Sequence, residues 1–330
     1  MTCNCPHLTS AKSASSARQF GFAVVMVLVV IAVLALLMSA LMARNSQLLQ
    51  RSMGKLHQYQ AQAYLVGSEA WAQQILQDDL LQSDNDTLTE TWAFPVPMVA
   101  VNGGEVSGYM IDLSGRFNIN NLVVADEPDP IWVAVFRALL DRSGASPDLV
   151  WSVVDWLDAD SEAHNGGLED AIYYTAEQPY RVANGQLVDI SELNLIKGFS
   201  KELVGQLRPY LSALPENVKI NVNTAPEPVL EAIVNVWDKP NWDASSLRQE
   251  RPWLKLEDSP LSAGGADENP EQPDKLYAGN MENYLSVKSD FFLLDASARV
   301  SEQYSRVQVT LGRTNNKVMV LSRIWLPGNE

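Results

Sequence analysis

The longest uninterrupted apolar stretch lies near the amino terminus, over Phe22–Ala43, and no charged residue occurs between Arg18 and Arg44. As a helix rising about 1.5 Å per residue, this stretch spans roughly 33 Å, enough to cross a bilayer core of about 30 Å. The alternatives are a buried core helix and a cleaved secretory signal. However, the stretch is apolar on all sides, and the apolar region of a signal peptide usually has only about 7–15 residues. The pattern therefore predicts a transmembrane helix.

A second pattern continues this helix beyond the apolar stretch. Apolar residues recur there at steps of three or four: Leu49, Met53, Leu56, Tyr59, Ala63, Val66 and Ala70. This spacing places them on one side of a helix, and no proline occurs between Pro6 and Pro95. We therefore expect one helix over about Phe22–Leu81, embedded in lipid over its first third and packed on a globular body through this stripe.

Alternation of apolar and polar residues replaces the helical spacing further along the chain. It occurs over Val106–Asn118, Phe291–Val300, Ser305–Gly312 and Lys317–Leu326. Such alternation is typical of strands with one buried face, and Asn102-Gly103-Gly104 before the first strand is a good hairpin turn. We expect these strands to form one antiparallel sheet packed against the amphipathic part of the long helix.

Between these strands the chain has the pattern of helices. The helical segments are expected over Asp129–Asp141, Ser146–Leu157, Val188–Tyr210 and Asn223–Val236. Val188–Tyr210 is also similar to a DNA-binding helix-hairpin-helix, but its charges balance, which favours a packing role. The acid-rich Leu256–Lys275 is expected to be a mobile surface loop, with a partner contact or a cation site as the alternative. The predicted fold class is α+β, with a large all-helical domain inserted into the sheet.

The composition narrows the range of functions. The chain has 330 residues, with 24 Lys and Arg against 40 Asp and Glu, and a formal net charge of −16. That charge repels phosphates, so nucleic acid is not an expected partner. The only cysteines are Cys3 and Cys5, which leaves the body without a disulfide, a cysteine nucleophile or a zinc–thiolate site. Three histidines, no nucleophile elbow and no phosphate-binding glycine loop argue against an enzyme.

The densest cluster of candidate chemistry is an acidic stretch over residues 155–170. It contains no Lys or Arg and six acids: Asp155, Asp158, Asp160, Glu162, Glu169 and Asp170. These groups repel one another, and a hard divalent cation with oxygen ligands would relieve the repulsion. We therefore expect Ca²⁺ here, and the expected ligands are Asp158, Asp160, Glu169, Asp170 and Asp155, the last of which could instead belong to the preceding helix. The alternative is a solvated acidic loop whose acids cap helices.

The segment in front of the apolar stretch resembles a type IV prepilin leader. Arg18-Gln19-Phe20-Gly21 is followed directly by Phe22 and the apolar run. The resemblance implies that a membrane prepilin peptidase cuts between Gly21 and Phe22 and methylates the new amino terminus. Most pilins and pseudopilins have a glutamate five residues into the mature chain, where this sequence has Met26. In lacking that acid the chain resembles the protein K family of type II secretion systems.

The resemblance to the protein K family extends over essentially the whole chain. It also rests on Asp155–Asp160, on Ser191-Glu192-Leu193 with Gly198, and on Ile220–Pro226. It implies a pilin-like fold whose parts are a removed leader (1–21), a membrane helix (22–43), a pseudopilin domain (44–118 and 284–330) and an inserted helical domain (119–283).

The same resemblance implies a function. It implies a minor pseudopilin, held by one helix in the bacterial inner membrane with its body in the periplasm, that joins minor pseudopilins I and J at the tip of the pseudopilus. There it would support export of folded proteins across the outer membrane. A subunit at the tip has no neighbour above it whose amino terminus needs a glutamate, and family members bind calcium. Two alternatives stay open: a membrane-anchored sensor of a cation or basic partner, and a membrane-tethered hydrolase.

Overall fold

The computed structural model describes residues 1, 16–160, 163–164, 180–215, 217–237, 243–263, 274–276, 279–314 and 316–327. It forms two compact units, residues 1–60 and residues 61–330. The first helix runs through both, because its first part belongs to the first unit and its last turns belong to the second.

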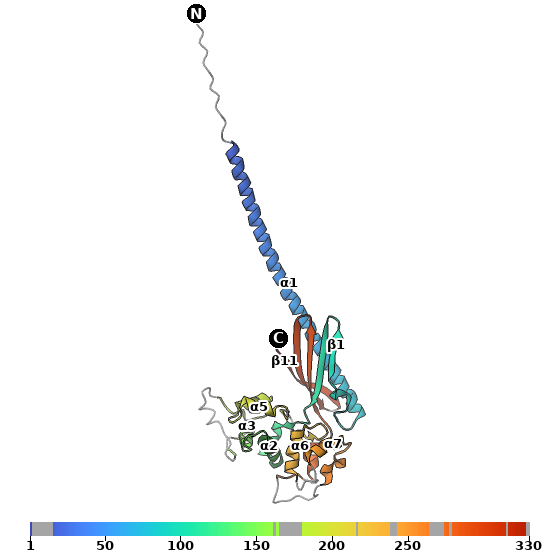
Figure 1. The fold of residues 1–330 in the computed structure, drawn as a ribbon. Helices are drawn as coiled ribbons and strands as arrows, with labels where there is room; N and C mark the ends of the chain where they lie inside the picture. Colours follow the sequence, from blue (N-terminus) through green and yellow to red (C-terminus); the bar gives the residue numbers. More distant parts are fainter. Residues whose placement is uncertain are drawn as a thin grey trace. The chain divides into compact units, whose positions relative to one another are not determined.

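This first helix, α1, covers Ser16–Gln82 and is drawn in blue in Figure 1. Its 67 residues correspond to a length of about 100 Å. Its most apolar stretch of 18 residues has a mean hydropathy of 3.2, and none of that stretch is buried in the protein. An exposed apolar helix of this length is compatible with a single membrane-spanning anchor.

The face of α1 that packs on the body differs from the predicted stripe. In the second unit the buried positions of α1 are Ala61, Leu65, Glu69, Ala72 and Leu76. The predicted stripe lies about half a turn away, and Ala63, Val66 and Ala70 are exposed. Glu69 accounts for the difference, because an acid interrupts the apolar pattern of the buried face. Arg323 pairs with Glu69 through two hydrogen bonds of 2.8 Å each, which makes its burial tolerable.

Five strands form one antiparallel sheet in the order β1-β2-β9-β10-β11 (Figure 1). Their bounds are β1 Val96–Val101, β2 Gly104–Asp112, β9 Phe291–Val300, β10 Gln303–Thr314 and β11 Lys317–Leu326. The predicted turn joins β1 to β2, and Gly103 has the positive φ of 78° that such a turn requires. β9 and β11 have their predicted bounds, whereas β1 at the far edge was not expected from the alternation.

The strand predicted over Val106–Asn118 ends early, at Asp112. The Asp112 carboxylate accepts a hydrogen bond of 2.7 Å from the backbone N–H of Ser114, which turns the chain out of the sheet. Gly115 follows, and a Cβ atom there would lie 2.5 Å from the hydroxyl of Thr224. The close approach of two backbone segments therefore ends the strand, and alternation does not show such an approach.

The helices lie between β2 and β9 in the sequence. Among the described residues, the α-helices there are α2 Pro130–Arg142, α3 Leu149–Leu157, α5 Lys201–Leu207, α6 Glu227–Val236, α7 Ala244–Glu250 and α8 Met281–Tyr284. The 3-10 helices are η2 Ile119–Leu122, η3 Ile190–Leu195, η4 Leu256–Asp258 and η5 Pro260–Ala263, and η1 Thr91–Ala93 precedes β1. Short strands pair as β3 Phe117–Asn118 with β6 Leu211–Ser212, β4 Val123–Val124 with β5 Glu127–Pro128, and β7 Ile220–Asn221 with β8 Leu285–Ser286. The predicted α+β fold class is confirmed.

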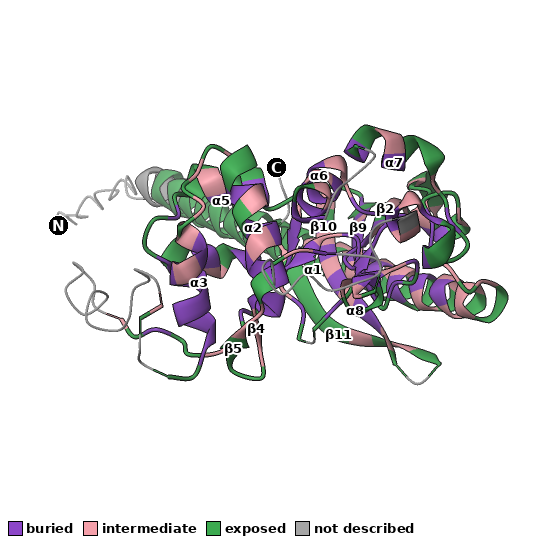
Figure 2. Ribbon diagram, turned by 90° about the horizontal axis from the view of Figure 1, so that it is seen from below, coloured by how far each residue is buried: buried purple, intermediate pink, exposed green. Residues whose placement is uncertain are grey.

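The sheet and the helices each have an apolar core. Figure 2 colours all buried residues purple, and the core residues are among them. Against the sheet, Trp92 of η1 contacts Phe292 of β9 edge-on, with ring centroids 5.0 Å apart. Among the helices, Phe117 stacks on Phe136 of α2 at 5.5 Å and meets Trp132 edge-on at 5.8 Å. All five rings are at most 1% exposed, so the two cores fix the two parts of the body by ordinary apolar packing.

Buried asparagines join segments that have no regular strands. Asn121 donates to the carbonyl of Val218 at 2.7 Å and accepts from its N–H at 3.0 Å. Asn223 makes the same two-bond pair with Trp253, at 2.9 Å for both bonds. Asn221 donates to the Ser289 hydroxyl at 2.7 Å. These side-chain amides replace backbone partners between distant segments, which explains the asparagines of the Ile220–Pro226 motif.

Two other predicted segments differ in detail. The expected loop over 256–275 begins as η4 and η5, with Leu256 and Leu261 buried, and residues 264–273 of it lie outside the described chain. In Val188–Tyr210 the first expected helix is the 3-10 helix η3. Gly198, with a φ of 101°, lies between η3 and α5 and leaves no room for a Cβ beside the Leu149 side chain. The segment packs on the core as expected.

Candidate functional site

The carboxyl end of α3 brings three titratable side chains together. Asp155 lies within α3 and Asp158 directly follows it, and both are fully buried. The backbone N–H of His164 donates to Asp155 Oδ1 at 2.9 Å. The ring Nδ1 of His164 lies 3.2 Å from the same oxygen and 3.4 Å from Asp158 Oδ2. One ligand atom from each residue lies within 4.8 Å of the others, so the cluster is compact enough to hold one ion.

Asp158 is the least compensated acid of this cluster. Neither of its carboxylate oxygens accepts a hydrogen bond from any residue that the structure describes. Burial raises the pKa of Asp158 to about 6, and the charges of Asp160 and Asp155 act in the same direction, whereas His164 acts against them. Because a buried carboxylate is costly without a counter-charge, the site favours a cation.

Two further acids surround Asp158. Asp160 is exposed, and its backbone carbonyl accepts a hydrogen bond of 2.8 Å from Asn184. Asp126 comes from the turn between β4 and β5, where it and Ala125 have positive φ angles, and its charge also raises the pKa of Asp158. Neither Asp126 nor His164 was among the predicted ligands. His164 lies in the acidic stretch and could have been included, but only the fold brings Asp126 near.

The structure therefore brings part of the predicted ligand set together. Asp155 and Asp158 lie side by side, and Asp155 belongs to α3, the position that the sequence left open. The charge of Asp160 acts on Asp158, although Asp160 itself is exposed. The other two predicted ligands, Glu169 and Asp170, lie outside the described residues. Carboxylate oxygens are the ligands that hard divalent cations prefer, whereas an imidazole is more typical of a transition-metal site.

The predicted processing site lies on α1. A Cβ atom added to Gly21 would have no neighbour within 4 Å. The next residue, Phe22, is 70% exposed, and Met26 is 53% exposed. Gly21 and Phe22 therefore lie on an exposed part of α1.

Part of the predicted stripe forms an exposed apolar row on α1. The row consists of Leu49, Met53, Leu56 and Tyr59, with exposed fractions of 58, 56, 64 and 66%. Their spacing places them along one side of the helix within the first unit. Single exposed apolar residues are ordinary, but a continuous row suits contact with another apolar surface.

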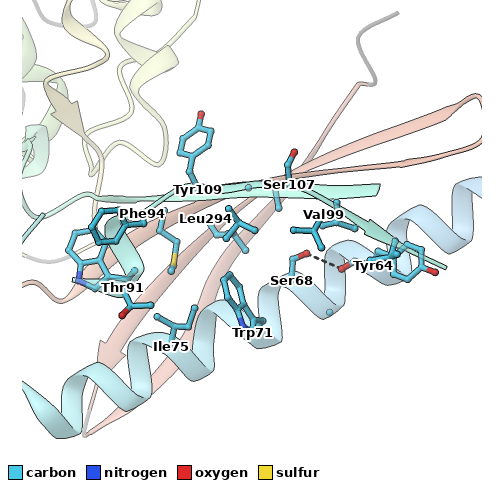
Figure 3. A pocket seen from close by; sticks show the side chains of 18 of the residues that line it. Tyr64, Ser68, Trp71, Ile75, Thr91, Phe94, Val99, Ser107, Tyr109 and Leu294 are labelled. Atoms are coloured by element: carbon cyan, nitrogen blue, oxygen red, sulfur yellow. Dashed lines mark hydrogen bonds between the residues drawn. The ribbon is translucent and has the colours of Figure 1, made fainter. Parts of the chain in front are cut away.

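The second unit has a different apolar surface, a groove of about 500 Å³ between α1 and the β1 edge of the sheet (Figure 3). Trp71 and Ile75 of α1 line it, with Val99 of β1 and Phe94. Half of Trp71 (50%) and most of Phe94 (61%) are exposed. The groove therefore presents aromatic side chains beside an edge strand, and the sequence pattern did not indicate it because it expected the other face of α1 to pack.

Comparison with known proteins identifies the relatives of the chain. The family model described as type II secretion system (T2SS), protein K matches residues 115–216. The type II secretion system protein K of Pectobacterium carotovorum subsp. carotovorum is 31% identical over 325 residues, which covers 93% of this chain and 96% of that protein. The protein K of Pseudomonas aeruginosa is 38% identical over 230 residues, 66% of this chain and 69% of its own length.

A solved structure shares the fold. A chain from the crystal structure of the GspK-GspI-GspJ complex of the enterotoxigenic Escherichia coli type 2 secretion system superimposes with a TM-score of 0.71 at 24% identity. The match covers 84% of this chain and 100% of that one. The near full-length match to curated relatives agrees with this common architecture. The chain therefore belongs to the type II secretion system protein K family, a family of minor pseudopilins, and its long apolar helix and antiparallel sheet agree with that assignment.

Proposed function

We propose that this chain is a tip subunit of the pseudopilus, anchored in the bacterial inner membrane by α1 with its body in the periplasm. It assembles there with minor pseudopilins I and J, and its role is assembly in support of secretion, not catalysis. The observation that supports this best is the exposed apolar row on α1. The solved relative comes from a complex of GspK, GspI and GspJ, which supports the same partners for this chain.

The row has the properties of a helix-packing surface. Its four side chains are all more than half exposed and follow the steps of three and four at which helices interlock. Fully burying one such side chain contributes about 1.5–3 kcal/mol. A row of this length therefore supports a stable contact with the helix of a neighbouring subunit. Met26, in place of a glutamate, supports a position with no subunit above it.

Replacing Leu56 with glutamate is expected to weaken co-purification of the chain with I and J from detergent-solubilised membranes by about tenfold or more. The reason is that the buried face of the contact would have to take up a charge, which costs more than 1.4 kcal/mol. The stability of the body itself should not change, because the Leu56 side chain is 64% exposed.

The matched control is Gln58→Glu, which adds the same charge to an exposed position about half a turn away on the same helix. It should co-purify as the unaltered chain does. Equal recovery of I and J with both variants would show that the row is not the contact.

We further propose that the chain is processed between Gly21 and Phe22. The mass of the amino-terminal peptide of the membrane-extracted protein tests this, and we expect a chain that begins at N-methylated Phe22. Gly21→Leu should keep the leader, since a prepilin-like signal ends in glycine and a large side chain would obstruct the bond. An intact leader in the unaltered chain would contradict the proposal and would favour a membrane-anchored sensor.

We also propose that the cluster at the end of α3 binds Ca²⁺. Asp158 and Asp155 would supply buried carboxylate oxygens, and Asp160 a further acid at the surface. Glu169 and Asp170 are proposed to complete the set. The residues fit such an ion because both oxygens of the buried Asp158 lack a described hydrogen-bond donor. A bound cation would neutralise the repelling acids and hold the segment after α3 against the helical domain.

A further inference from the structure

A small cavity in the body has a mixed lining that neither the assembly nor the proposed cation site uses. It has a volume of about 240 Å³ and lies between η1, the end of β2 and the turn before α6. Leu88, Trp92, Met110 and Pro209 form apolar walls. Leu88 is 51% exposed, so this side chain lies where the cavity meets solvent. The polar members of the lining are Asp112, Arg116 and Thr224.

Arg116 is the cation of this cavity, and its side chain is half-buried. Within the described residues its guanidinium donates one hydrogen bond, from Nη1 to the carbonyl of Arg208, and this bond is long, at 3.4 Å. No carboxylate lies within ion-pair distance of its guanidinium among the residues that the structure describes. Burial lowers the pKa of Arg116, and the nearby charge of Arg208 acts in the same direction. A guanidinium in such surroundings gains from an anion.

Asp112 is the acid in the lining of this cavity, but its carboxylate already accepts several hydrogen bonds. It accepts hydrogen bonds from the Ser114 N–H at 2.7 Å and from the hydroxyls of Thr224 and Ser289. Asp112 acts on Arg116 through its charge, which raises the pKa of the guanidinium, and no hydrogen bond joins the two side chains in the described structure. The charge of Asp112 also limits what can bind, because it repels a doubly charged anion about twice as strongly as a single carboxylate.

We propose that this cavity binds a single carboxylate carried on a short apolar group, with the carboxylate on the Arg116 guanidinium and the apolar group against Trp92, Met110 and Leu88. Two oxygens in a plane match the paired N–H groups of arginine. This volume is below the roughly 300–1,000 Å³ of pockets for drug-sized ligands, so a short chain of about six carbons is a suitable size of probe. The carboxylate could belong to a free aliphatic acid or to the end of a protein chain that finishes in an apolar residue.

The probe that tests the proposal is hexanoate, titrated into the detergent-solubilised full chain and followed by NMR line broadening of the acid. We expect a Kd on the order of 1 mM, typical of a ligand of this size. Hexanamide, which has the same shape without the charge, should bind at least tenfold more weakly. A peptide ending in leucine should compete with hexanoate if chain ends are the source, and its amidated form should not. If hexanoate binds but the peptide does not compete with it, the site is assigned to free acids.

The test variant is Arg116→Gln, which should weaken hexanoate binding at least tenfold, with Arg137→Gln as a control on an exposed arginine. Because the first variant could disturb the fold, Leu88→Trp gives a second test. The larger tryptophan side chain would occupy the cavity, while Arg116 stays in place. Because Leu88 is half exposed, the fold should tolerate the change, and hexanoate binding should be abolished. Equal affinity for hexanoate and hexanamide would overturn the proposal. Unchanged hexanoate binding in Leu88→Trp or in a folded Arg116→Gln would overturn it as well.

Discussion

Replacing Arg313 with leucine is expected to lower the free energy of unfolding of the body by about 3–5 kcal/mol. The Arg313 side chain is only 5% exposed and donates to the carboxylates of Asp79, at 2.7 Å, and Asp86. It also donates to the carbonyls of Leu76, at 3.2 Å, and Ser289, at 3.1 Å. One guanidinium of β10 thus joins the end of α1, the loop after it and the segment just before β9.

The cost arises from what the substitution leaves behind. Burial already raises the pKa of Asp79, although the Arg313 guanidinium beside it acts in the opposite direction. Without the cation, Asp79 and the buried Asp86 would face each other with no counter-charge. The Arg313 guanidinium also lies 4.7 Å from the centre of the Phe292 ring, and that favourable contact would be lost.

The measurement is urea unfolding of the detergent-solubilised chain, followed by tryptophan fluorescence. Arg137→Leu is the control, because the Arg137–Asp148 pair is 45% and 72% exposed and should contribute less than about 1 kcal/mol. Adding Asp86→Asn to Arg313→Leu should recover part of the loss, since it removes one of the stranded charges. A loss below about 1 kcal/mol in the single variant would show that the buried network does not hold these segments together.

Saturating Ca²⁺ is expected to raise the free energy of unfolding of the same chain by about 2.7 kcal/mol at a free concentration 100 times the Kd. The ion should bind the folded state alone, because α3 and the segment that follows bring Asp155 and Asp158 together only after folding. Calorimetry and thermal unfolding in Ca²⁺ and in chelator measure the effect. Mg²⁺ should stabilise less, since it requires a stricter six-fold geometry.

The test variant is Asp158→Asn, which keeps the size of the side chain and removes the charge. It should abolish the Ca²⁺ effect, whereas Asp258→Asn, at an exposed acid of the same helical domain, should leave it unchanged. His164→Gln separates an oxygen site from one that uses the imidazole, and we expect it to retain Ca²⁺. Absence of both binding heat and a thermal shift in the unaltered chain would refute the site.

Local pattern was sufficient for much of the architecture. The continuous helix follows from the apolar run and the absence of proline. The strands β9 and β11 follow from the alternation of apolar and polar residues, which extends over the full length of each strand. These elements are set by periodicity and by short-range backbone geometry, which are properties of neighbouring residues. The family was also accessible, because the leader-like segment, Met26 and the short motifs are local features.

The packing face of α1 could not be obtained in this way. The number of apolar residues on each side of the helix favours the side that begins with Leu49, but the body packs on a side that includes Glu69. That choice depends on Arg323, which is more than two hundred residues away in the sequence and pairs with Glu69 only in the folded sheet. An ion pair of this kind reverses the expected preference of an acid for water.

For the candidate cation site, too, some features follow from the sequence and others only from the tertiary structure. The sequence by itself determined that acids without basic neighbours follow one helix, because their density over residues 155–170 is a local property. Only the tertiary structure decided that Asp155 and Asp158 are buried, that His164 lies against both and that Asp126 approaches from another turn. Burial and the approach of distant charges set the electrostatics of a site, and both arise from chain segments that meet only when the protein folds.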